Sequence, residues 1–183
     1  MRRPSAVNIY CHQQTRRWFV VAAFFLISLV AAPAVAATVH IVALGASNTA
    51  GKGVGSATAW PAQLERMLRA KGYDAQVSNQ GTSGDDTGRM LARVDSAVPQ
   101  GTQIVILDKA ASNDRMRGVN TSANIAQLSS HFRARGIKVI VIEGMYGWAN
   151  HQLQADGIHI TEAGHAAVAA KLIPRVTAMI GKK

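Results

Sequence analysis

Cysteine is nearly absent from this 183-residue sequence, in which Cys11 is the single one. Cys11 lies before a long apolar run, so the chain that follows the run contains no thiol. These facts exclude an intrachain disulfide framework, and they exclude a cysteine nucleophile or cysteine-ligated zinc in the part after the run.

Aromatic residues are also scarce, at 5% of the chain, whereas hydrophobic residues make up 48%. This balance excludes an intrinsically disordered chain and predicts a globular core built from Val, Ile, Leu and Ala. A chain of this length is typical of one domain, and it is long enough to bury a substantial core.

Acidic residues are missing from the first 36 positions. There, Arg16 and Arg17 precede an uncharged run over residues 18–37 that ends in the sequence Ala-Val-Ala-Ala. A basic segment, an apolar stretch and a small-x-small site predict a secretory signal peptide over residues 1–36. The competing interpretation is an uncleaved membrane anchor, because about 20 apolar residues can span a bilayer.

Both interpretations place the remainder, a domain over residues 37–183, outside the cytoplasm, because the arginines before the run are expected to stay inside. We therefore expect a periplasmic or secreted domain that meets a membrane only through its N-terminal segment. Four of the 20 Lys and Arg residues and none of the 10 acidic residues precede Ala37, so the domain carries a net charge of +6. It has no run of five like charges, so nucleic acid is not an expected partner.

From residue 38 onward, short β-branched apolar runs alternate with helical patterns, which is typical of a parallel sheet covered by helices. Residues 137–142 predict a strand buried on both faces. Thr161 is the expected N-cap of the last helix, which Pro174 should kink or end. The expected fold is a three-layer α/β/α sandwich with four to five parallel strands, and its working site should lie at the carboxyl ends of the strands. The predicted strands cover residues 39–44, 74–78, 103–107 and 137–142, and the predicted helices cover residues 60–71, 87–98, 122–135 and 161–180.

A glycine-rich turn over residues 45–53 directly follows the first predicted strand. A phosphate-binding loop fails on spacing, because five residues separate Gly45 from Gly51 where that loop has four, and Gly53 stands where a Ser or Thr would hold magnesium. A dinucleotide-binding turn fails too, because it needs Gly where this turn has Ser47. The turn therefore presents a serine at the carboxyl edge of the sheet.

A carboxylate and an imidazole, Asp156 and His159, lie just before the last predicted helix. A carboxylate three residues ahead of a histidine can orient the ring through one nitrogen and leave the other free to accept a proton from a hydroxyl. Alone, this pair is more typical of a surface turn than of a catalytic site. A zinc site is not expected, because the histidines lack the i, i+4 spacing with a flanking Glu that zinc hydrolases use.

Taken together, these blocks resemble the SGNH hydrolases, also called the GDSL family, especially the small bacterial periplasmic enzymes with thioesterase, lysophospholipase and arylesterase activity. The blocks occur in the family's order: the strand and turn of residues 39–47, Ala-Trp-Pro at 59–61, Asn-Gln-Gly-Thr-Ser-Gly-Asp at 79–85, Ser-Asn-Asp at 112–114 and Asp-Gly-Ile-His at 156–159. The resemblance implies a flavodoxin-like sandwich that needs neither a metal nor an organic cofactor.

The resemblance also implies roles for individual residues. Ser47 would be the nucleophile, His159 its base and Asp156 the group that orients the imidazole. The oxyanion hole would consist of the Ser47 amide, the Gly84 amide and the Asn113 side chain. The implied substrates are small acyl esters or thioesters.

Three departures from the family pattern bear on these expectations. Ala46 replaces the aspartate of Gly-Asp-Ser, Ala111 stands where the third block usually has glycine, and residues 143–155 are shorter than the family's usual helix and fifth strand. They leave open a carbohydrate acetyl esterase, and a non-catalytic module that binds an envelope glycan or lipid on the same fold. One edge of the sheet is expected to be missing.

Overall fold

A computed structural model of the chain describes residues 37–180. The predicted signal peptide over residues 1–36 lies outside the described residues. Within them, four strands form one parallel sheet in the order β2-β1-β3-β4, as the alternating pattern predicts. The strands are β1 (Val39–Gly45), β2 (Ala75–Gly81), β3 (Ile104–Asp108) and β4 (Lys138–Ile142).

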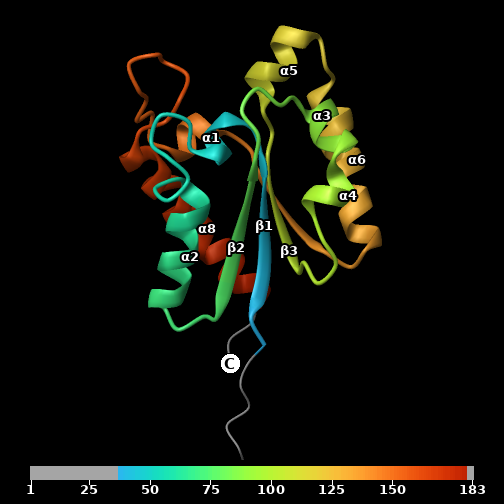
Figure 1. Cartoon of the computed structure of the whole chain (residues 1–183), viewed down its shortest axis with the longest axis vertical. Coiled ribbons are helices and arrows are strands. Elements are labelled where there is room, and N and C mark those ends of the chain that lie inside the picture. Colours follow the sequence, from blue (N-terminus) through green and yellow to red (C-terminus); the bar gives the residue numbers. More distant parts are fainter. Residues whose placement is uncertain (1–36, 181–183) are drawn as a thin grey trace, which may run out of the picture. The chain divides into compact units, whose positions relative to one another are not determined.

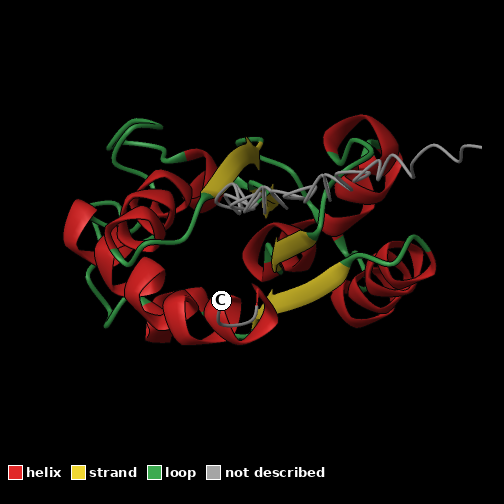
Figure 2. Cartoon of the chain, turned by 90° about the horizontal axis from the view of Figure 1, so that it is seen from below, coloured by secondary structure: helices red, strands yellow, loops and turns green. Residues whose placement is uncertain are grey.

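Helices cover both faces of this sheet, so the three-layer α/β/α prediction is confirmed. The helices α2 and α8 lie on one face, and α3, α4 and α6 lie on the other (Figure 1). Figure 2 shows the strands between two groups of helices. The longer helices are α2 (Trp60–Ala70), α6 (Thr121–Ala134) and α8 (Glu162–Ile180), and the shorter ones are α1 (Ser47–Ala50), α3 (Thr87–Ala92), α4 (Val94–Ala97), α5 (Ala111–Arg117) and α7 (Met145–Trp148).

Alternating side chains of the central strands build two separate cores. Ile41 and Ala43 pack in the core that contains Trp60 of α2, whereas Val42 and Leu44 pack in the core with Phe132 of α6. Successive strand residues point to opposite faces, so one apolar run serves both cores. Burying a side chain of the size of leucine stabilises a fold by about 1.5–3 kcal/mol, and these two layers therefore fix β1 at the centre of the sheet.

Two predicted elements differ in the structure. The helix expected over residues 87–98 is broken at Arg93, whose backbone (φ −114°, ψ 13°) separates α3 from α4. The strand expected to be buried on both faces is β4, which lies at the sheet edge, with Lys138 exposed and Val139 and Val141 half-buried. The apolar pattern of this strand indicates a strand but not its position in the sheet.

The last helix, α8, agrees with the prediction at its start and continues past Pro174. Its start agrees with the prediction, because the Thr161 hydroxyl accepts a hydrogen bond from the Gly164 amide at 3.2 Å. The helix does not end at Pro174, because α8 runs through this residue to Ile180. Proline leaves the carbonyl four residues earlier without a helical donor, and that residue, Ala170, is exposed to water, which can supply one.

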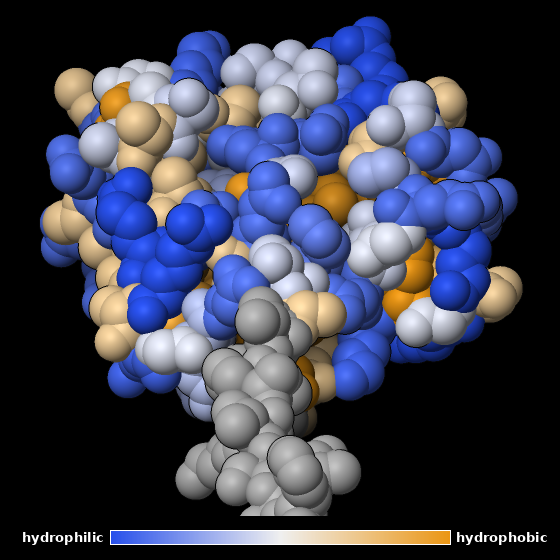
Figure 3. Space-filling view, turned by 60° about the horizontal axis from the view of Figure 1, so that its bottom comes forward, coloured by the Kyte–Doolittle hydropathy of each residue, from blue (hydrophilic) through white to orange (hydrophobic). Residues whose placement is uncertain are grey.

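The described part of the chain, residues 37–180, contains no helix that is both long and apolar enough to cross a bilayer. The face seen in Figure 3 is mostly hydrophilic, and its apolar side chains form small separate spots. The opposite end of the sheet, where the strands have their carboxyl ends, carries the candidate site.

Candidate active site

Ser47 lies two residues after the end of β1, at the first position of α1. The turn that places it there depends on Gly45, because a Cβ at that position would lie 2.2 Å from the Thr49 hydroxyl oxygen. Glycine thus lets the strand turn sharply into the helix. The serine side chain is left at the edge of the sheet instead of in the core.

His159 faces this serine from a loop far away in the sequence. Its Nε2 atom lies 3.0 Å from the Ser47 hydroxyl oxygen, although the two residues are 112 positions apart. Its Nδ1 atom lies 2.5 Å from the Asp156 carboxylate. The structure therefore brings Ser47, His159 and Asp156 into one hydrogen-bonded row.

The Asp156 carboxylate is held as an anion by its own loop. The His159 amide and imidazole, followed by the Ile158 amide, donate to it and hold its pKa well below the usual range. A carboxylate that faces Nδ1 keeps the imidazole proton on that nitrogen. Nε2 is then free to accept the hydrogen of the Ser47 hydroxyl.

Asn48 holds the loop of His159 against α1. Its Oδ1 atom accepts a hydrogen bond from the Ile160 amide at 3.0 Å, and its Nδ2 atom donates to the Ile158 carbonyl at 3.4 Å. The two bonds grip the chain on either side of His159. Asn48 therefore ties the histidine to the helix that carries Ser47.

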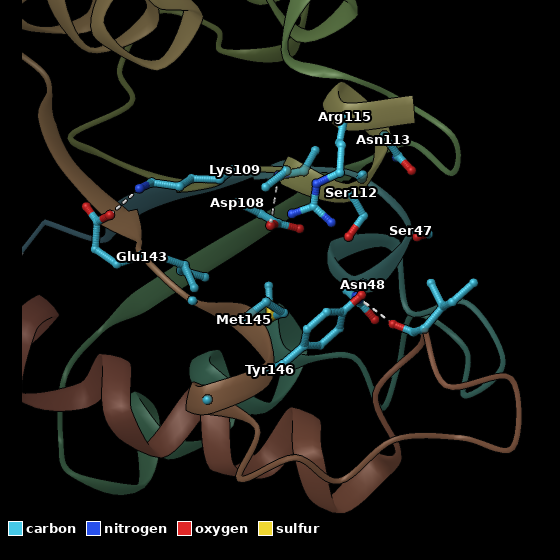
Figure 4. A pocket seen from close by; sticks show the side chains of 17 residues that line it. Ser47, Asn48, Asp108, Lys109, Ser112, Asn113, Arg115, Glu143, Met145 and Tyr146 are labelled. Carbon is cyan, nitrogen blue, oxygen red and sulfur yellow. Dashed lines mark hydrogen bonds and ion pairs between the residues drawn. The ribbon is translucent and has the colours of Figure 1, made fainter. Parts of the chain in front are cut away.

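A pocket of about 420 Å³ opens beside Ser47 (Figure 4). Most of its lining comes from the segment after β3 and from the segment after β4, which includes Met145 and Tyr146. Asn113 of α5 also lines it and is anchored by its Nδ2 atom, which donates to the Asp85 carbonyl at 2.5 Å. An amide nitrogen has a second hydrogen, so this anchor still leaves one donor.

Gly84 does not line this pocket, but its loop is bonded to α5. The Gly84 carbonyl accepts a hydrogen bond from Arg117 Nη1 at 2.6 Å, and the next residue holds Asn113. Gly84 has a φ of +83°, in the region that glycine adopts without strain. Two of the three residues expected to supply oxyanion donors, Gly84 and Asn113, thus belong to one connected loop and helix.

Arg93 holds the loop that carries Gly84 through an ion pair and hydrogen bonds. Its Nε atom lies 2.8 Å from the Asp85 carboxylate, and its Nη2 atom donates to the Gln80 and Gly45 carbonyls. One side chain therefore joins the end of β1, the end of β2 and the loop that carries Gly84. The break between α3 and α4 occurs at this residue.

A buried carboxylate, Asp108, forms part of the pocket wall at the end of β3. Burial raises its pKa, and hydrogen bonds from the Ala110 amide and the Thr49 hydroxyl offset part of that effect. Neither Asp108 nor the residues Asn48 and Arg93 were predicted. Nothing in their local sequence distinguishes them from ordinary surface or capping residues.

Groups of three or more His, Cys, Asp or Glu side chains that could hold a metal ion do not occur within residues 37–180. His165 shows why histidine content alone does not indicate a metal site. It is fully buried, and its Nδ1 atom accepts a hydrogen bond from the Trp60 amide at 3.1 Å. It therefore has a structural partner in the core.

A family model described as GDSL-like Lipase/Acylhydrolase matches residues 43–150, which is more than half of the chain. The chain belongs to this family. The matched segment of the GDSL-like chain includes Ser47, Gly84 and Asn113, and it ends before Asp156 and His159. The predicted relationship to SGNH hydrolases is thereby confirmed.

Two curated relatives of this GDSL-like protein are similar over 110 residues. Esterase TesA of Pseudomonas aeruginosa is 29% identical and the Arylesterase of Vibrio mimicus is 30% identical, and each match covers 58% of this chain and 55% of the relative. The chain thus matches about half the length of these relatives. The crystal structure of TesA has a TM-score of 0.67 and 23% identity, covering 76% of this chain and 99% of that one, and supports the fold.

Proposed function

We propose that the protein is a serine esterase that cleaves ester or thioester bonds of small acyl substrates. The observation that carries this proposal is the 3.0 Å approach of His159 Nε2 to the Ser47 hydroxyl at the mouth of a pocket. Nucleophile and base within hydrogen-bond reach, with the base oriented by a third group, are the mark of covalent serine catalysis. The names of the two curated relatives agree with this activity.

In the proposed mechanism, His159 takes the proton of Ser47 as the serine oxygen attacks the acyl carbonyl. Asp156 stabilises the imidazolium that forms and keeps the ring in its orientation. The imidazolium then protonates the leaving alcohol or thiol. Water, activated by the same imidazole, releases the acyl group from the serine.

The oxyanion would be bound by three donors. Ser47 is the first residue of α1, so its amide has no acceptor within the helix. The Gly84 amide and the second hydrogen of Asn113 Nδ2 would complete the site. Losing one such donor costs on the order of 100- to 1000-fold in rate, so Asn113→Ala should lower kcat strongly.

We further propose that residues 37–183 form the working domain and that the N-terminal segment exports it to the periplasm or the medium. Lysophospholipase or thioesterase preference belongs to the same proposal, because the site geometry is common to these reactions. The residues that line the pocket would set the preference between these substrates, and the hydrogen-bonded row of Ser47, His159 and Asp156 would not.

The proposal is tested by hydrolysis of 4-nitrophenyl butyrate by the full chain and by its Ser47→Ala variant. A matched control is Ser122→Ala, which removes an exposed hydroxyl on α6, away from the pocket. We expect turnover in the wild type and the control and none in Ser47→Ala, with all three proteins equally folded. If the wild type is inert on esters, thioesters and acetylated sugars alike, the binding module becomes the better account.

A further inference from the structure

The pocket beside Ser47 contains a guanidinium without a counter-ion among residues 37–180. Arg115 lies in the last turn of α5, lines the pocket and extends into it beside Ser112 (Figure 4). It forms none of the salt bridges found in this part of the chain. Arg117, two positions later, differs because it pairs with Asp86 at 3.1 Å.

The other charged side chains that line the pocket form no ion pair with Arg115. Lys109 and Glu143 pair with one another at the side of the pocket away from Ser47, as the dashed line in Figure 4 shows. Asp108 is buried, and its carboxylate oxygens already accept hydrogen bonds from Thr49 and Ala110. Among residues 37–180, Arg115 therefore forms no ion pair with either carboxylate that lines the pocket.

We infer that the pocket takes substrates that carry an anionic group, a carboxylate or a phosphate, which pairs with Arg115 while the acyl carbonyl lies at Ser47. This inference rests on the proposed esterase function and names its substrate class. A guanidinium suits both anions, because its planar N–H donors match two oxygens at once. Arg115 is exposed, so water competes with the pairing, and we expect an effect of about fivefold on kcat/KM.

The test compares 4-nitrophenyl hydrogen glutarate with 4-nitrophenyl valerate, which has a methyl group in place of the distal carboxylate. Both esters are given to the wild type, to Arg115→Gln and to Arg133→Gln. Arg133 is a matched control because it is an exposed arginine on α6 that does not line the pocket. Inhibition of valerate ester hydrolysis by glutarate and by inorganic phosphate distinguishes the two anion classes.

We expect Arg115→Gln to lower kcat/KM for the glutarate ester about fivefold and to leave the valerate ester unchanged, while Arg133→Gln resembles the wild type. The inference is overturned if the ratio of kcat/KM for the glutarate ester to kcat/KM for the valerate ester is the same in the wild type and in Arg115→Gln. This holds whether both kcat/KM values stay unchanged or both fall equally.

If the wild type is inert on these two esters and also on thioesters and acetylated sugars, the proposed function fails, and the anion site is tested by binding instead. Calorimetry then measures glutarate and phosphate binding to Ser47→Ala with and without Arg115→Gln. Weaker binding of either anion in the double variant supports the site. Equal or absent binding overturns it.

Discussion

At the scale of single residues, Asn48 decides how well His159 faces Ser47. We predict that Asn48→Ala lowers kcat at least tenfold with little change in KM. The reason is that the loop would lose its 3.0 Å and 3.4 Å bonds to α1, and small displacements of a catalytic group are costly, up to about 100-fold for 1 Å. Steady-state kinetics on a short-chain nitrophenyl ester measures both constants. An unchanged kcat in a folded Asn48→Ala protein would show that the loop holds His159 without this contact.

Ala110 stores backbone strain at the start of α5. It adopts φ 49° and ψ 30°, a left-handed conformation that costs an L-residue roughly 1–2 kcal/mol. The family resemblance draws attention to Ala111, but in the structure the residue that would gain from glycine is its neighbour Ala110.

We predict that Ala110→Gly raises the free energy of unfolding by about 1 kcal/mol, and Tm by about 2–4 °C, because glycine adopts this conformation without strain. Thermal unfolding measures the change. Ala111→Gly is the matched control, since Ala111 is helical and glycine there should lower Tm. Equal shifts in the two variants would contradict the assignment of strain to Ala110.

At the scale of elements, one arginine joins the two strand ends that bear the site. Arg93→Met would leave the Asp85 carboxylate, whose side chain is 7% exposed, without its cation. Breaking a buried pair in this way costs about 3–5 kcal/mol, and we expect somewhat less here because the Arg93 side chain is 23% exposed.

Urea unfolding of Arg93→Met, Asp85→Asn and the double variant tests this prediction. The double variant should be more stable than Arg93→Met alone, because it removes the unpaired charge. Additive losses in the double variant would mean that the two residues do not interact.

The elements themselves show what a sequence can and cannot predict. The strand β1 and helix α2 were predicted to within a residue or so, because β1 is a short apolar run rich in β-branched residues and the apolar residues of α2 recur at helical spacing. The helix α5 has seven residues and α1 and α7 have four each, too short to show a period, and the break at Arg93 leaves no local signal. The site residues Ser47 and His159 were found through a family pattern, whereas Asn48 and Arg93 act through contacts between distant segments, which no local pattern encodes.

At the scale of the whole molecule, His165 links the stability of the domain to pH. It lies fully buried on α8 against α2, and burial lowers its pKa to about 4 from an ordinary value of 6.5. The folded protein therefore resists protonation that the unfolded chain accepts. The stabilisation is complete above pH 6.5 and declines as the pH falls from 6.5 to 4.

We predict that this group alone removes about 3 kcal/mol of unfolding free energy between pH 7.5 and pH 4. Urea unfolding of the wild type and His165→Asn at both pH values measures it, since asparagine can accept the Trp60 amide but does not titrate. The difference in unfolding free energy between the wild type and His165→Asn should be smaller at pH 4 than at pH 7.5. A difference that stays constant would mean that His165 does not carry this pH dependence.

Covalent labelling with a fluorophosphonate, followed by peptide mapping, tests whether Ser47 is an activated nucleophile. We predict one adduct on Ser47, which forms much more slowly in His159→Gln and is lost in Ser47→Ala. An adduct on another serine, or equal labelling of the wild type and His159→Gln, would contradict the proposed roles of Ser47 and His159.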